Sequence, residues 1–478
     1  MKPLLLLQMI SALFLSFASP QEQAERLFDN AQTFMNAQKY NEALTDLQTV
    51  VDQYGQTAWA PKALLELGNY YLHIEQSFEK ARSIFARIQK DYPASEEAPA
   101  AYYFKALIVE REGDQPSELE AAMADLIRMI SLYPDNQWLN GSFFLFGKLA
   151  MRLTNFAQSL SYFHRLELNF PNSEYLPKAL LLSAKAAYSL GEVDQAIMIL
   201  ARLESKFPNS EEFKLASAYL RLLDRFRHSN PGYDLDANFF GATPKQFQNP
   251  KDVWVSENGI VGIMDQRGAL FATLSPFAQL NSIASKDLVG FGEDPRSGIL
   301  VIYESRITNR EGMLLPTLSY PNGTVREIKS AAVDAYGRML VIDGNAKDLL
   351  VFDERGGFQK NLGLSRPRLV RCFQNEIWVL ANDGDTLNIF GAGLNFKGTG
   401  PGGLSSIVDF KFDPFGNLYV LADKGNQVAI FTQHGHKHED LNLKSGTYPL
   451  KQAQAIGVDS SGAIYLADRR SGAVFRFQ

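Results

Sequence analysis

Residues 413–423 read Asp-Pro-Phe-Gly-Asn-Leu-Tyr-Val-Leu-Ala-Asp, a turn followed by an unbroken apolar stretch that ends in a carboxylate. Residues 459–468, Asp-Ser-Ser-Gly-Ala-Ile-Tyr-Leu-Ala-Asp, repeat the pattern. Glycine suits the left-handed backbone of such a turn, and the β-branched and aromatic residues after it favour a strand. A unit that recurs in this way predicts an all-β repeat domain in the second half of the chain.

The same pattern can be read in six places. The copies span residues 259–265, 298–304, 337–343, 375–382, 416–423 and 462–468, and their last residues are 39, 39, 39, 41 and 45 positions apart. A period near 40 with several short strands per unit is typical of β-propeller blades, because a four-stranded sheet must stack on its neighbours to cover its faces. The sequence predicts six blades over residues 251–478, and these blades resemble NHL repeats.

Closure of this ring is a separate question, because Gln478 comes straight after the third strand of the last copy. The fourth strand is either missing or supplied by residues ahead of the first blade. Residues 236–247 are well placed to supply it, so we interpret 228–250 as a linker or a propeller-closing strand. Pairing of that kind joins the first and last blades and removes open sheet edges.

The first half of the chain has a different composition, with only 6 of the 35 glycines between residues 19 and 227. Five aromatic residues, each followed by Pro or Gly, share one register there: Tyr54, Tyr92, Tyr133, Phe170 and Phe207. Upstream of them stand five small residues, Ala43, Ala81, Ala122, Ser159 and Ala196, and five large apolar residues, Leu47, Phe85, Leu126, Phe163 and Leu200. Small residues let helices approach and proline ends a helix, so the pattern predicts five helix pairs and a capping helix over 21–227.

These repeats resemble tetratricopeptide repeats, and the Tyr/Phe-Pro-x-Ser ending is similar to repeats of bacterial envelope proteins such as the Tol-Pal coordinator. The resemblance implies an α-solenoid whose groove, lined by the first helix of each pair, holds a peptide or a partner's helix. The candidate groove residues are Tyr70, Tyr71, Tyr102, Tyr103, Phe143, Phe144 and Tyr188. The alternative is that these aromatic side chains pack between repeats, with one member of each adjacent pair in the core.

Charge and cysteine content exclude several classes of function. The formal net charge is −6, and no run of Lys or Arg provides a phosphate-binding surface, so nucleic acid is not an expected partner. Residues 19–227 hold 21 basic and 27 acidic residues, which makes the helical half the place to look for a basic partner. The single cysteine, Cys372, excludes a disulfide framework.

The first 18 residues have the pattern of a secretory signal peptide. Lys2 is followed by an apolar run over 4–17, and Ser16-Phe17-Ala18 forms a small-x-small cleavage site. A short membrane anchor is the alternative, but the run is shorter than the roughly 20 residues that span a bilayer. The site lacks a cysteine for lipid attachment, and no later segment is apolar enough to span a membrane. We therefore expect a protein that is exported to the periplasm or secreted.

The blade loops contain the candidate binding residues of the second half. An acidic or amide residue ends the second strand of every blade, namely Asp265, Glu304, Asp343, Asn382, Asp423 and Asp468. Such a ring could bind a cation, but we favour a structural role, because Asp at a strand end accepts hydrogen bonds from the turn. The residues that vary from blade to blade are better binding candidates: Asp383, Asp385, Lys424, Arg469 and Arg470.

The remaining motifs do not form a catalytic constellation. His434, His436 and His438 alternate in a turn, which we interpret as solvated rather than metal-binding, and Cys372 lies in an apolar strand as a structural thiol. The sequence therefore predicts a non-enzymatic scaffold for protein or peptide partners, without a cofactor, in cell-envelope assembly or maintenance. The alternatives are a metal-dependent enzyme similar to lyases and lactonases, or a ligand sensor, using the propeller channel, and an element whose repeats merely stack.

Overall fold

The computed structural model describes residues 19–113, 115–227, 232–274, 277–295, 298–381, 386–443 and 450–478. The chain forms two compact units that divide between Leu149 and Ala150. The proposed signal peptide and the candidate residues Asn382, Asp383 and Asp385 lie outside the described residues.

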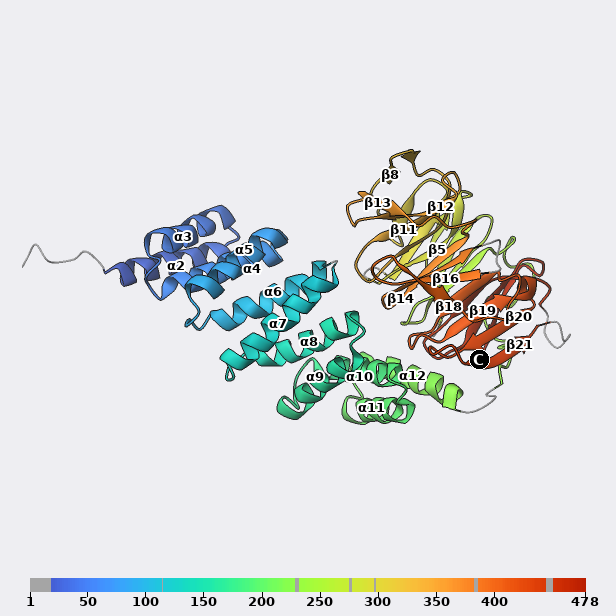
Figure 1. The fold of residues 1–478 in the computed structure, drawn as a ribbon, viewed down its shortest axis with the longest axis horizontal. Helices are drawn as coiled ribbons and strands as arrows, with labels where there is room; N and C mark the ends of the chain where they lie inside the picture. The colour runs from blue at the N-terminus through green and yellow to red at the C-terminus, as the bar shows by residue number, and fades with distance from the viewer. Residues whose placement is uncertain are drawn as a thin grey trace, which may run out of the picture. The chain divides into compact units, whose positions relative to one another are not determined.

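Helices make up all of the regular structure in the described residues before 228 (Figure 1). The first unit contains α2 (Pro20–Asn36), α3 (Tyr40–Gln53), α4 (Trp59–His73), α5 (Phe78–Asp91), α6 (Ala98–Glu112), α7 (Pro116–Leu132) and most of α8 (Leu139–Arg152). The second unit begins with α9 (Phe156–Asn169), α10 (Leu176–Ser189), α11 (Val193–Lys206) and α12 (Glu212–Arg227). None of these described helices has the length and apolar character needed to cross a bilayer.

The register predicted for the helical repeats is confirmed by burial. The five small residues are at most 5% exposed and the five large ones at most 2%. The aromatic residues at the repeat ends also connect one repeat to the next, since the Tyr92 hydroxyl donates to the Gly55 carbonyl at 2.8 Å and the Tyr133 hydroxyl to the Pro93 carbonyl at 2.6 Å. Gly68 permits the close approach of α4 and α5, because a Cβ there would lie 2.4 Å from the Phe85 ring.

Six antiparallel sheets follow, and each is one blade with its strands in chain order. Four blades have four strands each, and the first contains β1 (Asp252–Val255), β2 (Ile260–Met264), β3 (Gly268–Leu274) and β4 (Phe277–Ala284). The third contains β10 (Ile328–Val333), β11 (Met339–Asp343), β12 (Asp348–Phe352) and β13 (Phe358–Asn361), and the fourth contains β14 (Leu369–Phe373), β15 (Glu376–Ala381), β16 (Thr386–Phe390) and β17 (Phe396–Thr399). The fifth contains β18 (Asp409–Phe412), β19 (Leu418–Ala422), β20 (Gln427–Phe431) and β21 (Lys437–Asn442).

The second and sixth blades have three strands each in the described residues. The second contains β5 (Leu288–Asp294), β6 (Gly298–Tyr303) and β7 (Ile307–Asn309), with a hairpin of β8 (Ser319–Tyr320) and β9 (Gly323–Thr324) after it. The sixth contains β22 (Ala453–Val458), β23 (Ile464–Asp468) and β24 (Ala473–Phe477).

The segment ahead of the first blade covers the outer edge of the sixth. The Asp234 amide donates to the Gln478 carbonyl and the Gln478 amide donates back, both at 3.0 Å, and the Asp236 amide donates to the Arg476 carbonyl at 2.9 Å. Farther along, the Val474 amide donates to the Gly241 carbonyl at 2.9 Å. The pairing therefore begins two residues before the 236–247 segment that the sequence suggested, and it closes the ring.

The propeller core lies between neighbouring blades. Phe271 and Phe291 meet between the first and second blades, with ring centroids 5.7 Å apart, and Tyr465 packs with Val253 and Val261 between the sixth and the first. Comparable clusters fill the remaining contacts between adjacent blades. Because each blade buries both faces in this way, the inner strands β1, β5, β10, β14, β18 and β22 surround a central channel.

Candidate binding surfaces

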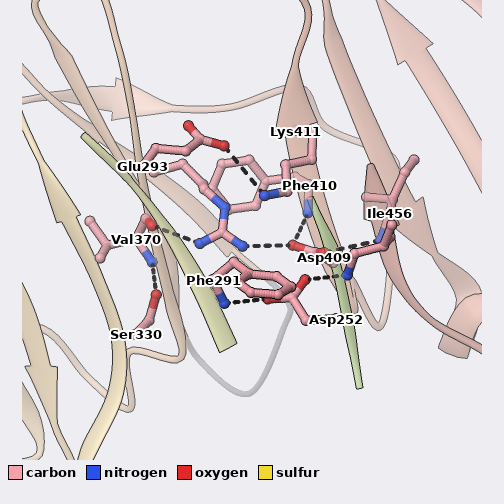
Figure 2. Close-up of polar contacts among 11 residues, drawn as sticks. Asp252, Phe291, Glu293, Ser330, Val370, Asp409, Phe410, Lys411 and Ile456 are labelled. Carbon is pink, nitrogen blue, oxygen red and sulfur yellow. Dashed lines mark hydrogen bonds and ion pairs between the residues drawn. The ribbon is translucent and has the colours of Figure 1, made fainter. Parts of the chain in front are cut away.

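Polar side chains near the start of alternate inner strands link neighbouring blades. They belong to Asp252 in β1, Ser330 in β10 and Asp409 in β18, and each accepts a backbone amide of the next inner strand (Figure 2). The donors are the amides of Phe291 at 2.7 Å, Val370 at 3.1 Å and Ile456 at 3.1 Å. These hydrogen bonds hold the inner strands together and occupy the side chains that make them.

Charged groups fill the middle of the channel. Arg371 is only 2% exposed; its guanidinium lies 3.5 Å from Asp409 Oδ1 and donates to the Val370 carbonyl at 3.1 Å. Lys411 Nζ donates to Glu293 Oε1 at 3.3 Å (Figure 2). Burial raises the pKa of the Asp252 carboxyl, and the nearby Lys411 opposes that effect. Burying such charges is costly unless they are paired, so this cluster acts as a polar plug between the two ends of the channel.

A cavity of about 640 Å³ opens at the end of the channel where the inner strands begin. Six cationic side chains line it. One is Arg371 of the plug, and we call the other five the cationic mouth: Lys251, Lys329, Arg368, Lys424 and Arg469. Arg371, Asp252 and Asp409 of the plug also reach this cavity.

Two of the residues predicted from blade-to-blade variation, Lys424 and Arg469, belong to this mouth. Lys424 follows β19 and Arg469 follows β23, so both lie in the loop between the second and third strands of their blades. Arg470 is exposed but does not line the cavity.

The other three cations of the mouth were not predicted. Lys251 and Arg368 stand immediately before β1 and β14, and Lys329 is the second residue of β10. Each is near the start of an inner strand. Comparing the residues at these starts from blade to blade, as well as those in the loops after the second strands, identifies all three.

A second cavity, of about 710 Å³, lies where the inner strands end. Its lining includes the carboxylates of Glu257, Glu293 and Glu311 together with Cys372. Burial raises the pKa of the Cys372 thiol well above its usual value, which disfavours the nucleophilic thiolate and agrees with the structural thiol expected from the sequence.

Helices of the second unit contact the blade turns at this end of the propeller. The Tyr188 hydroxyl of α10 donates to Asn417 Oδ1 at 2.8 Å, and the Phe415 ring lies 5.0 Å from the rings of both Tyr188 and Tyr219. At Gly462 an added Cβ would be 2.8 Å from Leu222 of α12. The last helices are therefore built onto the propeller, and they contact the turns at the end opposite the cationic mouth.

This contact changes the interpretation of Tyr188. The side chain is 4% exposed and its hydroxyl donates a hydrogen bond to Asn417. The backbone carbonyl of Tyr188 accepts a hydrogen bond from Gln433 Nε2 at 2.8 Å. The structure places Tyr188 in a contact within the chain, where the resemblance to tetratricopeptide repeats implied an open groove.

The other groove candidates fall into two groups. Tyr102, Phe143 and Phe144 are 6–9% exposed and belong to the core, as the packing alternative expects. Tyr70, Tyr71 and Tyr103 are half-buried. Since Tyr70 and Tyr71 are both half-buried, that pair does not divide into one core and one exposed residue, and a binding role for the three half-buried residues stays a prediction.

Two of the acidic residues at the ends of second strands, Asp343 and Asp468, accept hydrogen bonds from the backbone on both sides of the strand. Asp468 Oδ2 accepts the amides of Lys451 and Gln452 at 2.6 Å each, and Oδ1 accepts the Ser471 amide at 2.8 Å. Asp343 likewise receives amides from both sides, from Glu327 and Ala346. These carboxylates secure the loop that enters the blade as well as the turn that follows.

The three alternating histidines are not gathered around a common point. The His438 ring stacks on Phe226 of α12 with centroids 4.5 Å apart, and burial lowers its pKa. In the part of the chain that the structure describes, no three His, Cys, Asp or Glu side chains are close enough together to hold a metal ion.

Comparisons with known protein families support the helical repeats. Residues 20–142 match the family model of the outer membrane lipoprotein YfiO, and residues 178–210, which span α10 and α11, match a tetratricopeptide repeat. The chain is a tetratricopeptide-repeat array followed by a six-bladed β-propeller. The match to the lipoprotein family covers about a quarter of the chain. A search of curated proteins found no match to this chain.

Solved structures similar to this chain include several propellers. The WD40 β-propeller domain of Doa1 is 14% identical, with 52% of this chain and 97% of that chain covered and a TM-score of 0.38. Streptogramin B lyase is 11% identical over 52% and 99% of the two chains, with a TM-score of 0.39. A protein of unknown function from Bacteroides thetaiotaomicron is 11% identical over 52% and 72%, also at 0.39. The propeller assignment rests on the strand pairing described above.

Proposed function

We propose that this chain is an exported, non-enzymatic scaffold of the cell envelope that binds one protein through its helical repeats and a second through a propeller face. Repeat arrays and propellers are both architectures that present extended binding surfaces. The observation that carries the proposal is the match of residues 20–142 to an outer membrane lipoprotein family, in a chain that joins such repeats to a propeller.

The residues of the propeller support a binding role rather than chemistry. The channel carboxylates Asp252 and Asp409 accept hydrogen bonds from backbone amides. His434 and His436 lie just before β21, the outer strand of the fifth blade, and His438 lies in it.

The test is affinity capture of the tagged full chain, after crosslinking, from the cells that naturally produce it. We expect a mature protein that begins at Ser19, recovery in the envelope fraction, and specific captured proteins. The double substitution Tyr70→Ala/Tyr71→Ala should remove a subset of these proteins, while Tyr162→Ala on α9, the second helix of its pair, should not. Retention in the cytoplasm, or capture of no protein, would overturn the proposal.

A further inference from the structure

Cationic side chains outnumber carboxylates in the described lining of the cavity at the cationic mouth. Among the described residues, the carboxylates that line the cavity are those of Asp252 and Asp409. Asp252 accepts the amides of Val253 and Phe291, and Asp409 accepts those of Phe410 and Ile456 and is paired with Arg371. Both carboxylates are 7% exposed or less. Their hydrogen bonds and ion pair are with the inner strands and Arg371, and not with the cations of the rim.

The cations of the rim differ in how they are held. Lys251 Nζ donates to the Leu288 carbonyl at 3.3 Å, and Lys329 pairs with Glu327, both side chains being about half exposed. Lys424 and Arg469 have no carboxylate within ion-pair distance among the described residues. Arg368 also has an interaction partner, so Lys424 and Arg469 are the rim cations most available to an anionic ligand.

This concentration of charge is a local feature of the propeller. The chain as a whole carries a net charge of −6. Low-dielectric walls around a cleft of one charge sign focus the electric field and raise the local concentration of ligands with the opposite sign. Anionic ligands should therefore be attracted to this end of the channel.

The arrangement of the cations indicates the size of the ligand. They come from five of the six blades, since Lys251 precedes the first blade, Lys329, Arg368 and Lys424 belong to the third, fourth and fifth, and Arg469 belongs to the sixth. A single small anion cannot contact cations distributed around a ring, whereas an occupant with several anionic groups can. The cavity of about 640 Å³ lies in the range typical of specific ligand pockets.

We infer that the cationic mouth binds an acidic peptide segment, rich in Asp and Glu, of a protein partner. This inference rests on the proposed scaffold function and specifies the chemistry of its propeller-side partner. Bidentate and charge-assisted hydrogen bonds from Arg to carboxylates supply specificity, and the ring of charges supplies attraction. Because α10 and α12 contact turns at the opposite end, they leave this end of the second unit to a partner of its own.

The test measures binding of a fluorescein-labelled peptide of alternating Glu and Gly to the purified full chain by fluorescence anisotropy. A Gln/Gly peptide of the same length is the neutral control, and inorganic phosphate is the small-anion competitor. The variant Lys424→Glu/Arg469→Glu reverses two charges at the mouth. The matched control is Lys360→Glu/Arg470→Glu, which makes the same charge change at exposed residues that do not line the cavity.

We expect saturable binding of the acidic peptide that weakens about tenfold or more between about 50 and about 300 mM NaCl. The mouth variant should lose about tenfold in affinity, and the control variant should bind as the wild type does. Absence of peptide binding, equal loss in both variants, or tighter binding of phosphate than of peptide would overturn the inference. Circular dichroism of both variants verifies that they fold, and if the mouth variant does not, Lys424→Gln/Arg469→Gln replaces it.

Failure of this inference is distinguishable from failure of the scaffold function. If the peptide does not bind but Tyr70 and Tyr71 still determine captured proteins, only the chemistry of the mouth is wrong. If no protein is captured by the full chain at all, the scaffold function itself is wrong.

Discussion

Asp413 shows how the turns of the blades combine burial with hydrogen bonding. The carboxylate is 2% exposed and accepts the amides of Phe415 and Asn417 at 2.8 and 3.0 Å and the Asn417 side-chain amide at 2.7 Å. Burial nevertheless raises the pKa of Asp413 to about 6. Through Asn417 the residue also orients the acceptor of Tyr188, so its ionisation affects the contact between α10 and the fifth blade.

The pH dependence of stability follows from this shift. The folded chain binds the Asp413 proton more tightly than the unfolded chain, so the Asp413 contribution to the free energy of unfolding increases as pH falls from about 6 to about 4. The raised pKa corresponds to a gain of up to about 3 kcal/mol. Urea unfolding of the full chain at several pH values measures it. The variant Asp413→Asn should lack this part of the pH dependence, and an unchanged profile in that variant would contradict the assignment.

At the scale of elements, Phe415 joins the last helices to the fifth blade. Its ring is 2% exposed and packs between Tyr188 and Tyr219. The substitution Phe415→Ala should cost about 3–5 kcal/mol and leave a cavity at this contact. Hydrogen exchange of α10 and α12 should become faster, while Phe396→Ala, at a side chain that is 58% exposed, should leave both helices protected. Unchanged exchange in the Phe415 variant would show that the helices do not depend on this contact.

Ring closure makes a second prediction at the same scale. The Asp236 amide donates to the Arg476 carbonyl, and the Asp236 carboxylate pairs with the Arg476 guanidinium at 3.1 Å. Asp236→Pro removes both interactions and should destabilise the propeller by about 2 kcal/mol more than Asp236→Ala, which keeps the amide. Urea unfolding of the two variants measures this difference. Equal stability would mean that the backbone pairing of 234–236 is not needed for closure.

The register of elements could be predicted because it depends on local chemistry. Small residues such as Ala81, large ones such as Phe85, and the turn glycines recur at fixed spacing, and each is required where it stands by packing or by backbone geometry. The packing of α10 on the propeller could not be predicted, since Tyr188 and Asn417 are 229 positions apart and neither has an unusual neighbourhood in sequence. For the same reason the sequence pattern predicts a groove position for Tyr188, which the structure contradicts.

The candidate site was predictable in part. Lys424 and Arg469 stand out because they vary between otherwise similar loops. Lys251 and Lys329 do not stand out in the sequence. They come together because hydrogen bonds between different blades bring the starts of the inner strands to one end of the channel. Those contacts exist only once the ring has formed.

At the scale of the whole molecule, a scaffold and a metal enzyme make different predictions for metal content. We expect no stoichiometric calcium or zinc in the purified full chain, because the channel carboxylates Asp252 and Asp409 already accept backbone amides and Arg371 supplies the countercharge. Elemental analysis of the protein, with a chelator-treated sample as control, measures this. A stoichiometric metal that is lost in Asp252→Asn would favour the enzyme alternative.

The most direct test of the two-surface account is site-specific photo-crosslinking of the full chain in its native cell envelope. The photoreactive residue is placed at Tyr71 on α4, at Gln452 beside the cationic mouth, and at Lys360 on the outer strand β13 as a control. The account predicts one protein crosslinked from Tyr71, a different protein with an acidic segment crosslinked from Gln452, and neither of them from Lys360. Crosslinking of the same proteins from all three positions, or of none from Tyr71 and Gln452, would contradict it.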